Sequence, residues 1–143
     1  MYYFAYGSNM VAGQMATRCP NASVVSVACL RGYKFRINSR QVGTVVPDQN
    51  HQVYGLLWNI TPQDLLALDR YEEVKAGLYE TANVIVELLS NRQVEALIYL
   101  ATDPSIGAPG ARYIKDVIAA AKQWDLPQAY IHELATWLST DDE

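Results

Sequence analysis

The chain carries the sequence YYFAYGSNM at residues 2–10, close to its N-terminus. The aromatic run at residues 2–6 is typical of a short strand, and the run stops at Gly7. From residue 9 to residue 18, apolar and small residues recur at helical spacing. The segment therefore predicts a strand, a tight turn and a helix in direct succession.

Strand-forming segments dominate the centre of the chain. They are rich in Val, Ile, Leu, Tyr and Trp, and they are separated by Gly, Pro, Asn and Asp. The predicted strands cover residues 23–30, 33–38, 43–46, 52–58, 78–89 and 93–100. Between the last two, Ser90-Asn91 predicts a hairpin turn.

Helices are predicted in the middle and at the end of the chain. Thr61 and Pro62 form an N-cap followed by a proline in the first helical position, and Asp64 stands three residues after the cap. Two further helices are expected, at about residues 110–124 and after Pro127. The whole pattern predicts an α+β domain with a curled, barrel-like sheet.

Length and charge restrict the class of protein. A chain of 143 residues suits a single domain, which we expect at residues 1–139 with an acidic tail at 140–143. Half of the residues are hydrophobic and 18% are charged, as in globular proteins. The net charge of -4 and the lack of a basic cluster argue against nucleic acid or an anionic membrane as a partner.

Localisation is also suggested by the sequence. No stretch reaches the roughly 18 continuous apolar residues that a membrane span needs. The first 17 residues are uncharged, but polar residues interrupt them and no basic segment precedes them, so we expect no signal peptide and a cytoplasmic protein. The sequence leaves open whether the chain forms a homodimer.

Several familiar types of reactive site are not expected. Cys19 and Cys29 are too far apart for a CxxC motif, so we expect free, buried thiols. His51 and His132 have no partner at metal-ligand spacing, and we expect no metal. Ser8 lacks the second glycine of a GxSxG hydrolase elbow and is not expected to be a nucleophile.

The turn after the first strand is one candidate site. A glycine turn that leads into a helix leaves backbone N–H groups unpaired, and these groups bind negatively charged oxygen. Gly7 permits a close approach, while Ser8 or Asn9 can act as the helix N-cap. An ordinary strand-to-helix turn is the alternative interpretation.

A second candidate site is the acidic end of the middle helix. Asp69, Glu72 and Glu73 lie where the helix dipole is negative, at a cost on the order of 1 kcal/mol. Leu65, Leu68 and Glu72 share one helical face, so we expect Glu72 to face the interior and Glu73 to turn away. An apolar pocket raises the pKa of a carboxyl group, which suits a group that accepts and returns a proton. An exposed Glu at a frayed helix end is the alternative.

Tyrosine is abundant, with ten copies. A phenol fills a pocket and still donates a hydrogen bond. The tyrosines beside the candidate sites are Tyr6, Tyr71, Tyr79 and Tyr113. The tyrosines interpreted as packing residues are Tyr3, Tyr33, Tyr54, Tyr99 and Tyr130.

Four segments together resemble the gamma-glutamylcyclotransferase family, of the AIG2-like superfamily. They are FAYGSNM at residues 4–10, VYGLLW at 53–58, LDRYEEVKAGLY at 68–79, and Arg112-Tyr113. The resemblance implies a small mixed barrel with flanking helices. It also implies an enzyme that releases 5-oxoproline from a small gamma-glutamyl compound without a metal or cofactor.

The resemblance assigns a role to each candidate residue. Glu72 matches the catalytic glutamate, which moves a proton from the substrate's alpha-ammonium to the departing nitrogen. The remaining matches are expected to bind the substrate, and they are Tyr6, Gly7, Ser8, Asn9, Tyr79 and Tyr113. In this family the backbone N–H groups of the turn would stabilise the oxyanion.

The chain departs from the family pattern at two places. Glu73 stands where the family often has glycine, and the segment at residues 41–44 is shorter and poorer in glycine than in some relatives. The sequence therefore leaves open which amine or amino acid is the leaving group of the gamma-glutamyl substrate. A non-catalytic module that binds a metabolite or a partner in the same pocket is the alternative function.

Overall fold

The computed structural model describes residues 1–108 and 110–138. The elements, in chain order, are β1 (Tyr2–Ala5), the 3-10 helix η1 (Ser8–Met10), α1 (Ala12–Arg18), β2 (Ser23–Ile37), β3 (Gly43–Asn59), α2 (Pro62–Tyr71), β4 (Tyr79–Leu88), β5 (Gln93–Ala101), α3 (Ala111–Gln123) and α4 (Gln128–Ala135). The predicted acidic tail at residues 140–143 lies outside the described residues.

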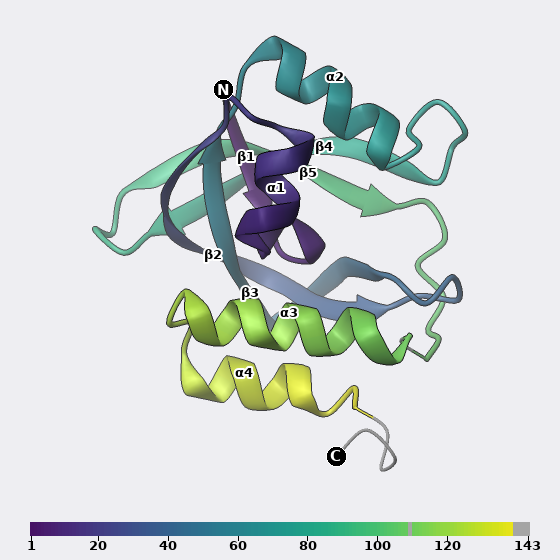
Figure 1. Ribbon diagram of the computed structural model, residues 1–143. Coiled ribbons are helices and arrows are strands. Elements are labelled where there is room, and N and C mark those ends of the chain that lie inside the picture. The colour runs from purple at the N-terminus through teal and green to yellow at the C-terminus, as the bar shows by residue number, and fades with distance from the viewer. Residues whose placement is uncertain (109, 139–143) are drawn as a thin grey trace.

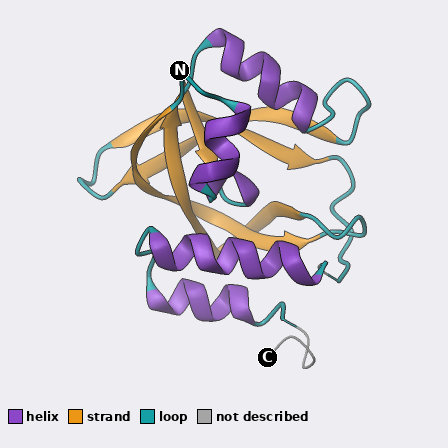
Figure 2. Ribbon diagram, in the orientation of Figure 1, coloured by secondary structure: helices purple, strands orange, loops and turns teal. Residues whose placement is uncertain are grey.

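The strands form a closed barrel in the order β1-β3-β2-β4-β5. Antiparallel pairing joins β1 to β3, β3 to β2, β2 to β4 and β4 to β5. The barrel is closed by a parallel pairing of β1 with β5 at Tyr3 and Leu97. The helices pack outside the strands, with α2 on one side and the stacked pair α3 and α4 on the other (Figures 1 and 2). This confirms the α+β class with a small, mixed, barrel-like sheet and flanking helices.

Two pairs of predicted strands are single long strands. Residues 23–30 and 33–38 join in β2, where the register shifts beside Gly32, whose φ is 82°. Residues 43–46 and 52–58 join in β3, and Pro47 stays inside this strand as the partner of Tyr33. Glycine and proline here mark an irregularity of the sheet and not its end, because a bulge bends a strand while pairing continues on both sides.

The predicted helix at residues 9–18 is divided into η1 and α1. Val11 is extended between them and is the N-cap of α1, while Gly7 is the N-cap of η1. The expectation that Ser8 or Asn9 caps the helix is therefore wrong. Both side chains instead accept hydrogen bonds from Arg18 at the end of α1, so a contact across the segment replaces the local cap.

The start of α2 is confirmed in detail. The Thr61 hydroxyl accepts a hydrogen bond from the Asp64 backbone at 3.1 Å, and the Asp64 carboxylate accepts one from the Thr61 backbone at 3.0 Å. This reciprocal capping box fixes where α2 begins. The α3 and α4 helices lie where they were predicted.

One continuous core fills the barrel and the space under the helices. Its fully buried side chains include Phe4, Leu56, Leu57, Ile98, Ile114 and Leu134. Gly55 allows β1 and β3 to come very close, because a Cβ there would lie 2.2 Å from the Ala5 carbonyl oxygen. Cys19 and Cys29 are free and buried, as predicted. None of the helices in the described part of the chain has the length and apolar character needed to span a membrane.

Candidate active site

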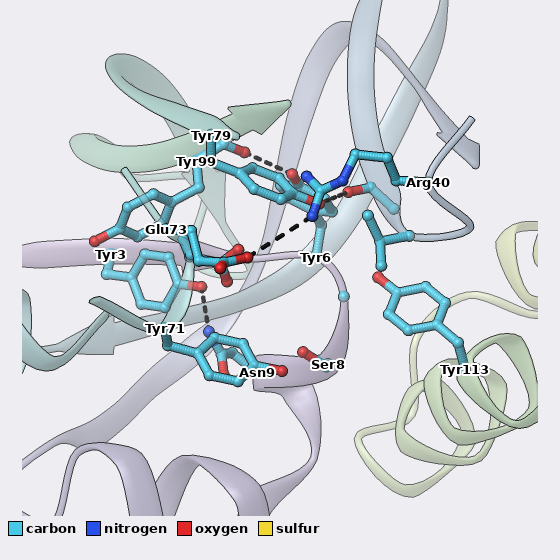
Figure 3. Close-up of a pocket in the computed structure, with 14 residues that line it drawn as sticks. Tyr3, Tyr6, Ser8, Asn9, Arg40, Tyr71, Glu73, Tyr79, Tyr99 and Tyr113 are labelled. Atoms are coloured by element: carbon cyan, nitrogen blue, oxygen red, sulfur yellow. Dashed lines mark hydrogen bonds and ion pairs between the residues drawn. The ribbon is translucent and has the colours of Figure 1, made fainter. Parts of the chain in front are cut away.

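All seven residues predicted to form a site line one cavity of about 320 Å³ (Figure 3). They are Tyr6, Gly7, Ser8, Asn9, Glu72, Tyr79 and Tyr113. They come from five parts of the chain: the end of β1, the turn into η1, the end of α2, the start of β4 and the first turn of α3. The cavity volume is at the lower end of the roughly 300–1,000 Å³ typical of small-molecule sites.

Glu72 is the C-cap of α2 and points its side chain into this cavity. The residue is half-buried, and burial raises the pKa of its carboxyl group from 4.5 to about 7. The positive charge of Arg18 lowers this pKa, and the negative charge of Glu73 raises it further. A carboxyl group with such a pKa exchanges a proton readily near neutral pH.

The turn after β1 presents backbone N–H groups. The first hydrogen bond of η1 is donated by Met10 to the Gly7 carbonyl oxygen at 3.0 Å. The N–H groups of residues 7–9 precede this bond, so they have no partner inside the helix. They belong to residues that line the same cavity as Glu72, which places potential donors and a proton acceptor around one space.

Arg18 holds the side chains of the turn after β1 in place. Its guanidinium donates to the Ser8 hydroxyl at 3.2 Å and to the Asn9 amide oxygen. The Asn9 amide nitrogen in turn donates to the Tyr3 hydroxyl at 2.8 Å. Arg18 also lies over the ring of Tyr71, 3.4 Å from its centroid. The network fixes the turn, and it places a positive charge near Glu72.

Phenol groups provide much of the polar wall. The Tyr79 hydroxyl donates to the Gly43 carbonyl oxygen at 2.7 Å, and the Tyr6 hydroxyl donates to the Tyr99 carbonyl oxygen at 2.5 Å. Tyr113 reaches in from α3, and its hydroxyl lies beside Gly7 and Gly43. At each glycine, a Cβ would lie only 2.6 Å from that hydroxyl oxygen. The two glycines therefore provide the space in which the Tyr113 phenol sits.

These phenols remain protonated. Burial raises the pKa of Tyr6, Tyr79 and Tyr113 above the ordinary value of 10.0. The negative charge of Glu72 raises each of these values further. A neutral phenol has one O–H donor, which Tyr6 and Tyr79 direct at backbone carbonyl oxygens, so Tyr113 is the member of this group placed to donate to an anionic group of a ligand.

The cavity also contains residues that were not predicted to belong to it. Tyr3 and Tyr99 were interpreted as packing residues, yet both line its floor. The Tyr99 hydroxyl donates to the Asp69 carboxylate at 2.6 Å, which gives the first acid at the helix end a structural partner. Arg40 enters from the loop between β2 and β3, where no local sequence signal indicated a site.

Glu73 turns away from the buried stripe of α2, as predicted, and yet it lines the cavity. Its side chain is 57% exposed, but it lies at the rim, where a carboxylate oxygen is 3.8 Å from an Arg40 guanidinium nitrogen. Its backbone φ is 53°, the left-handed conformation that often follows a helix C-cap and that favours glycine. Glycine adopts this conformation without strain, which fits the expectation from the family resemblance that glycine often stands at this position.

The candidate site contains no cluster suited to a metal ion. Within residues 1–108 and 110–138, no group of three or more His, Cys, Asp or Glu side chains has the arrangement of a metal site. His51 lies outside the cavity and pairs with Asp48 at 3.1 Å. The lining of the cavity offers carboxyl, phenol, guanidinium and backbone groups.

Comparisons with known proteins agree with this fold and cavity. The chain is 29% identical to human "Gamma-glutamylcyclotransferase" over 142 residues, which cover 92% of this chain and 76% of the human protein. A solved structure named "Gamma-glutamyl cyclotransferase" superposes with a TM-score of 0.90 at 26% identity, covering 99% of this chain and 95% of that one. An uncharacterized human protein superposes with a TM-score of 0.88 at 27% identity, covering 99% and 94%. The sequence model of the AIG2-like family matches residues 52–134, more than half of the chain, and the protein therefore belongs to the AIG2-like family.

Proposed function

We propose that this protein is a cyclotransferase that releases 5-oxoproline from a gamma-glutamyl amino acid or gamma-glutamylamine. The observation that carries the proposal is Glu72, a half-buried carboxyl group with a pKa of about 7 that shares one cavity with the turn at residues 7–9. The names of the relatives, gamma-glutamylcyclotransferase, support the same reaction.

The gamma-glutamyl group of the substrate binds in the inner part of the cavity. Its gamma-carbonyl oxygen faces the backbone N–H groups of residues 7–9, which stabilise the negative charge that develops on this oxygen. Tyr113 is a protonated phenol and donates a hydrogen bond to the alpha-carboxylate, while Tyr79, whose hydroxyl donates to the Gly43 carbonyl oxygen, lines the wall beside it. Substrate recognition then uses neutral donors and leaves Glu72 free for proton transfer.

Glu72 accepts a proton from the substrate alpha-nitrogen and later returns it to the leaving nitrogen. In its ionised form it accepts a proton from the substrate alpha-ammonium, and the free amine attacks the gamma-carbonyl carbon. A carbon–nitrogen bond forms and closes the five-membered ring. The bond to the leaving nitrogen then breaks, while Glu72 returns the proton to this nitrogen. The ring nitrogen loses its second proton as the neutral lactam forms, and the released amine takes up this proton to become an ammonium group. The products are 5-oxoproline and a free amine or amino acid, and Glu72 is again ionised.

The nucleophile belongs to the substrate, so the protein needs no nucleophilic side chain. An intramolecular attack is accelerated when the substrate is held in a conformation close to the transition state. Buried Tyr3, Tyr6 and Asn9 form a rigid floor that is suited to this task. The buried charge of Glu72 fits proton transfer better than passive binding, because an anionic group next to an anionic ligand weakens binding.

The test is incubation of the protein with gamma-glutamyl-alanine and related gamma-glutamyl compounds, followed by chromatographic detection of 5-oxoproline. We expect 5-oxoproline and the leaving amine in equal amounts. Saturable binding with no product would instead support the non-catalytic binding module. Neither binding nor product with any gamma-glutamyl compound would refute the proposal.

A further inference from the structure

An ion pair at the mouth of the cavity has no role in the reaction described above. It joins Arg40 to Glu73 at 3.8 Å, and the two side chains are 38% and 57% exposed. Figure 3 shows the two side chains pointing toward each other, with a dashed line between them. Exposed ion pairs contribute little to folding stability, so stability does not account for this pair.

The loop that carries Arg40 is built to hold its position. Asn38 is completely buried, and its amide oxygen accepts hydrogen bonds from the backbone N–H groups of Arg40 at 3.0 Å and Val42 at 3.3 Å. The Asn38 backbone is packed so closely against Gly107 that a Cβ there would lie 2.3 Å from the Asn38 carbonyl oxygen. Arg40 therefore extends over the cavity from a fixed turn.

The depth of the cavity determines which part of a substrate meets this pair. The floor consists of buried side chains, namely Tyr3, Tyr6, Asn9 and Tyr99. The exposed lining residues are at the rim, namely Arg40, Tyr71 and Glu73. With the gamma-glutamyl group bound between Glu72 and the turn, the leaving group points outward and reaches the rim.

The charge at the rim selects one kind of leaving group. Among the described residues that line the cavity, Arg40 alone carries a positive charge. A guanidinium group binds a carboxylate through two parallel hydrogen bonds, and it does not bind an uncharged amide in this way. We propose that Arg40 is a specificity-determining residue that binds the carboxylate of a leaving amino acid. This inference rests on the proposed function, and within it Arg40 favours gamma-glutamyl amino acids over uncharged gamma-glutamylamines.

Glu73 has a defined part in this arrangement. Its carboxylate lies 3.8 Å from the Arg40 guanidinium and holds this group over the mouth of the cavity. A substrate carboxylate replaces Glu73 as the partner of Arg40, so Glu73 competes with the substrate. Removal of the Glu73 charge should therefore strengthen the preference for a carboxylate, whereas removal of the Arg40 charge should weaken it.

The experiment uses two substrates that differ only at the leaving group, gamma-glutamyl-alanine and gamma-glutamyl-alaninamide. The measured quantity is the ratio of their kcat/KM values. We expect the wild-type protein to prefer the carboxylate, and Arg40→Gln to lower the ratio roughly tenfold, as expected for the loss of a charged hydrogen bond. Most of this effect should be in KM. Glu73→Gln should raise the ratio severalfold.

The matched control is Arg92→Gln, which removes the same charge from an exposed residue beyond the far end of β4. It should leave the ratio at the wild-type value. If Arg40→Gln leaves the ratio unchanged, Arg40 does not select the leaving group, although the proposed reaction stands. If Arg40→Gln does not fold, an unchanged ratio in Glu73→Gln overturns the inference instead. If the wild-type protein releases 5-oxoproline from neither substrate nor from any other gamma-glutamyl compound, the proposed function fails and the inference fails with it.

Discussion

Replacement of Glu72 by Gln should affect catalysis and stability in different ways. The amide keeps the shape of the side chain, but it cannot carry the proton from the alpha-ammonium to the leaving nitrogen. A positioned general acid–base group contributes about 10²–10⁴-fold to the rate. We therefore expect Glu72→Gln to lower kcat for 5-oxoproline release from gamma-glutamyl-alanine by at least a hundredfold, with a smaller change in KM.

The effect on stability follows from the pKa of this residue. An increase from 4.5 to about 7 corresponds to about 3 kcal/mol, since each pKa unit is worth about 1.4 kcal/mol. Between these two values the folded state binds more protons than the unfolded state, so the free energy of unfolding falls as pH rises from 4.5 to about 7. Because Glu72 is only half-buried, we reduce this figure to about 2 kcal/mol.

Glu72→Gln removes this loss of stability. The variant should match the wild-type protein near pH 4 and be more stable by about 2 kcal/mol at pH 8, or roughly 8 °C in Tm for a chain of this length. Thermal unfolding at a series of pH values measures the difference. Glu80→Gln, at an exposed position of β4, is the control and should leave both activity and pH dependence unchanged.

Two results would refute this reasoning. One is a folded Glu72→Gln variant that releases 5-oxoproline at a rate within tenfold of the wild-type rate. The other is a variant whose unfolding keeps the wild-type dependence on pH, since the raised pKa would then belong to another group. The first result removes Glu72 from the reaction, and the second shows that its carboxyl group is not buried as the structure describes.

Three further predictions concern the pH profile, the turn and the fold. The kcat/KM for gamma-glutamyl-alanine should rise through an apparent pKa of about 7, because Glu72 must be ionised to accept the proton, and a flat profile from about pH 4 to 8 would contradict this. Gly7→Ala should lower activity at least tenfold with little change in Tm, because the new methyl group would lie 2.6 Å from the movable hydroxyl of Tyr113. Gly13→Ala, where nothing lies within 4 Å, is the matched control and should retain activity. Thr61→Ala removes one half of the capping box and should cost about 1 kcal/mol in the free energy of unfolding, as measured by urea denaturation. An unchanged urea midpoint would show that the box does not stabilise α2.

Some parts of the fold were predictable because their signals are local. The capping box of α2 involves Thr61 and Asp64, three residues apart, so the sequence contains the whole interaction. The orientation of Glu72 follows in the same way from its helical spacing relative to Leu68, and the structure places it in the cavity.

Other parts were not predictable from local patterns. Gly32 and Pro47 look like strand ends in the sequence, but each lies inside a long strand because pairing with the neighbouring strand continues on both sides. Ser8 and Asn9 are residue types that often cap helices, yet their side chains accept hydrogen bonds from Arg18 instead. In each case an interaction with another segment outweighs a local preference, which for a helix cap is worth about 1 kcal/mol.

The same division holds for the site. Residue order alone indicated a carboxyl group at the end of α2 and a glycine turn after β1, because spacing and backbone chemistry are properties of neighbouring residues. Closure of the barrel decided that the two meet in one cavity, with Tyr99 on its floor and Arg40 at its rim. These residues are separated by long stretches of chain, and the pKa of Glu72 depends on the burial that their packing creates. The burial of a side chain and the charges around it depend on all residues that are close to it in space. The sequence shows only which residues are close along the chain.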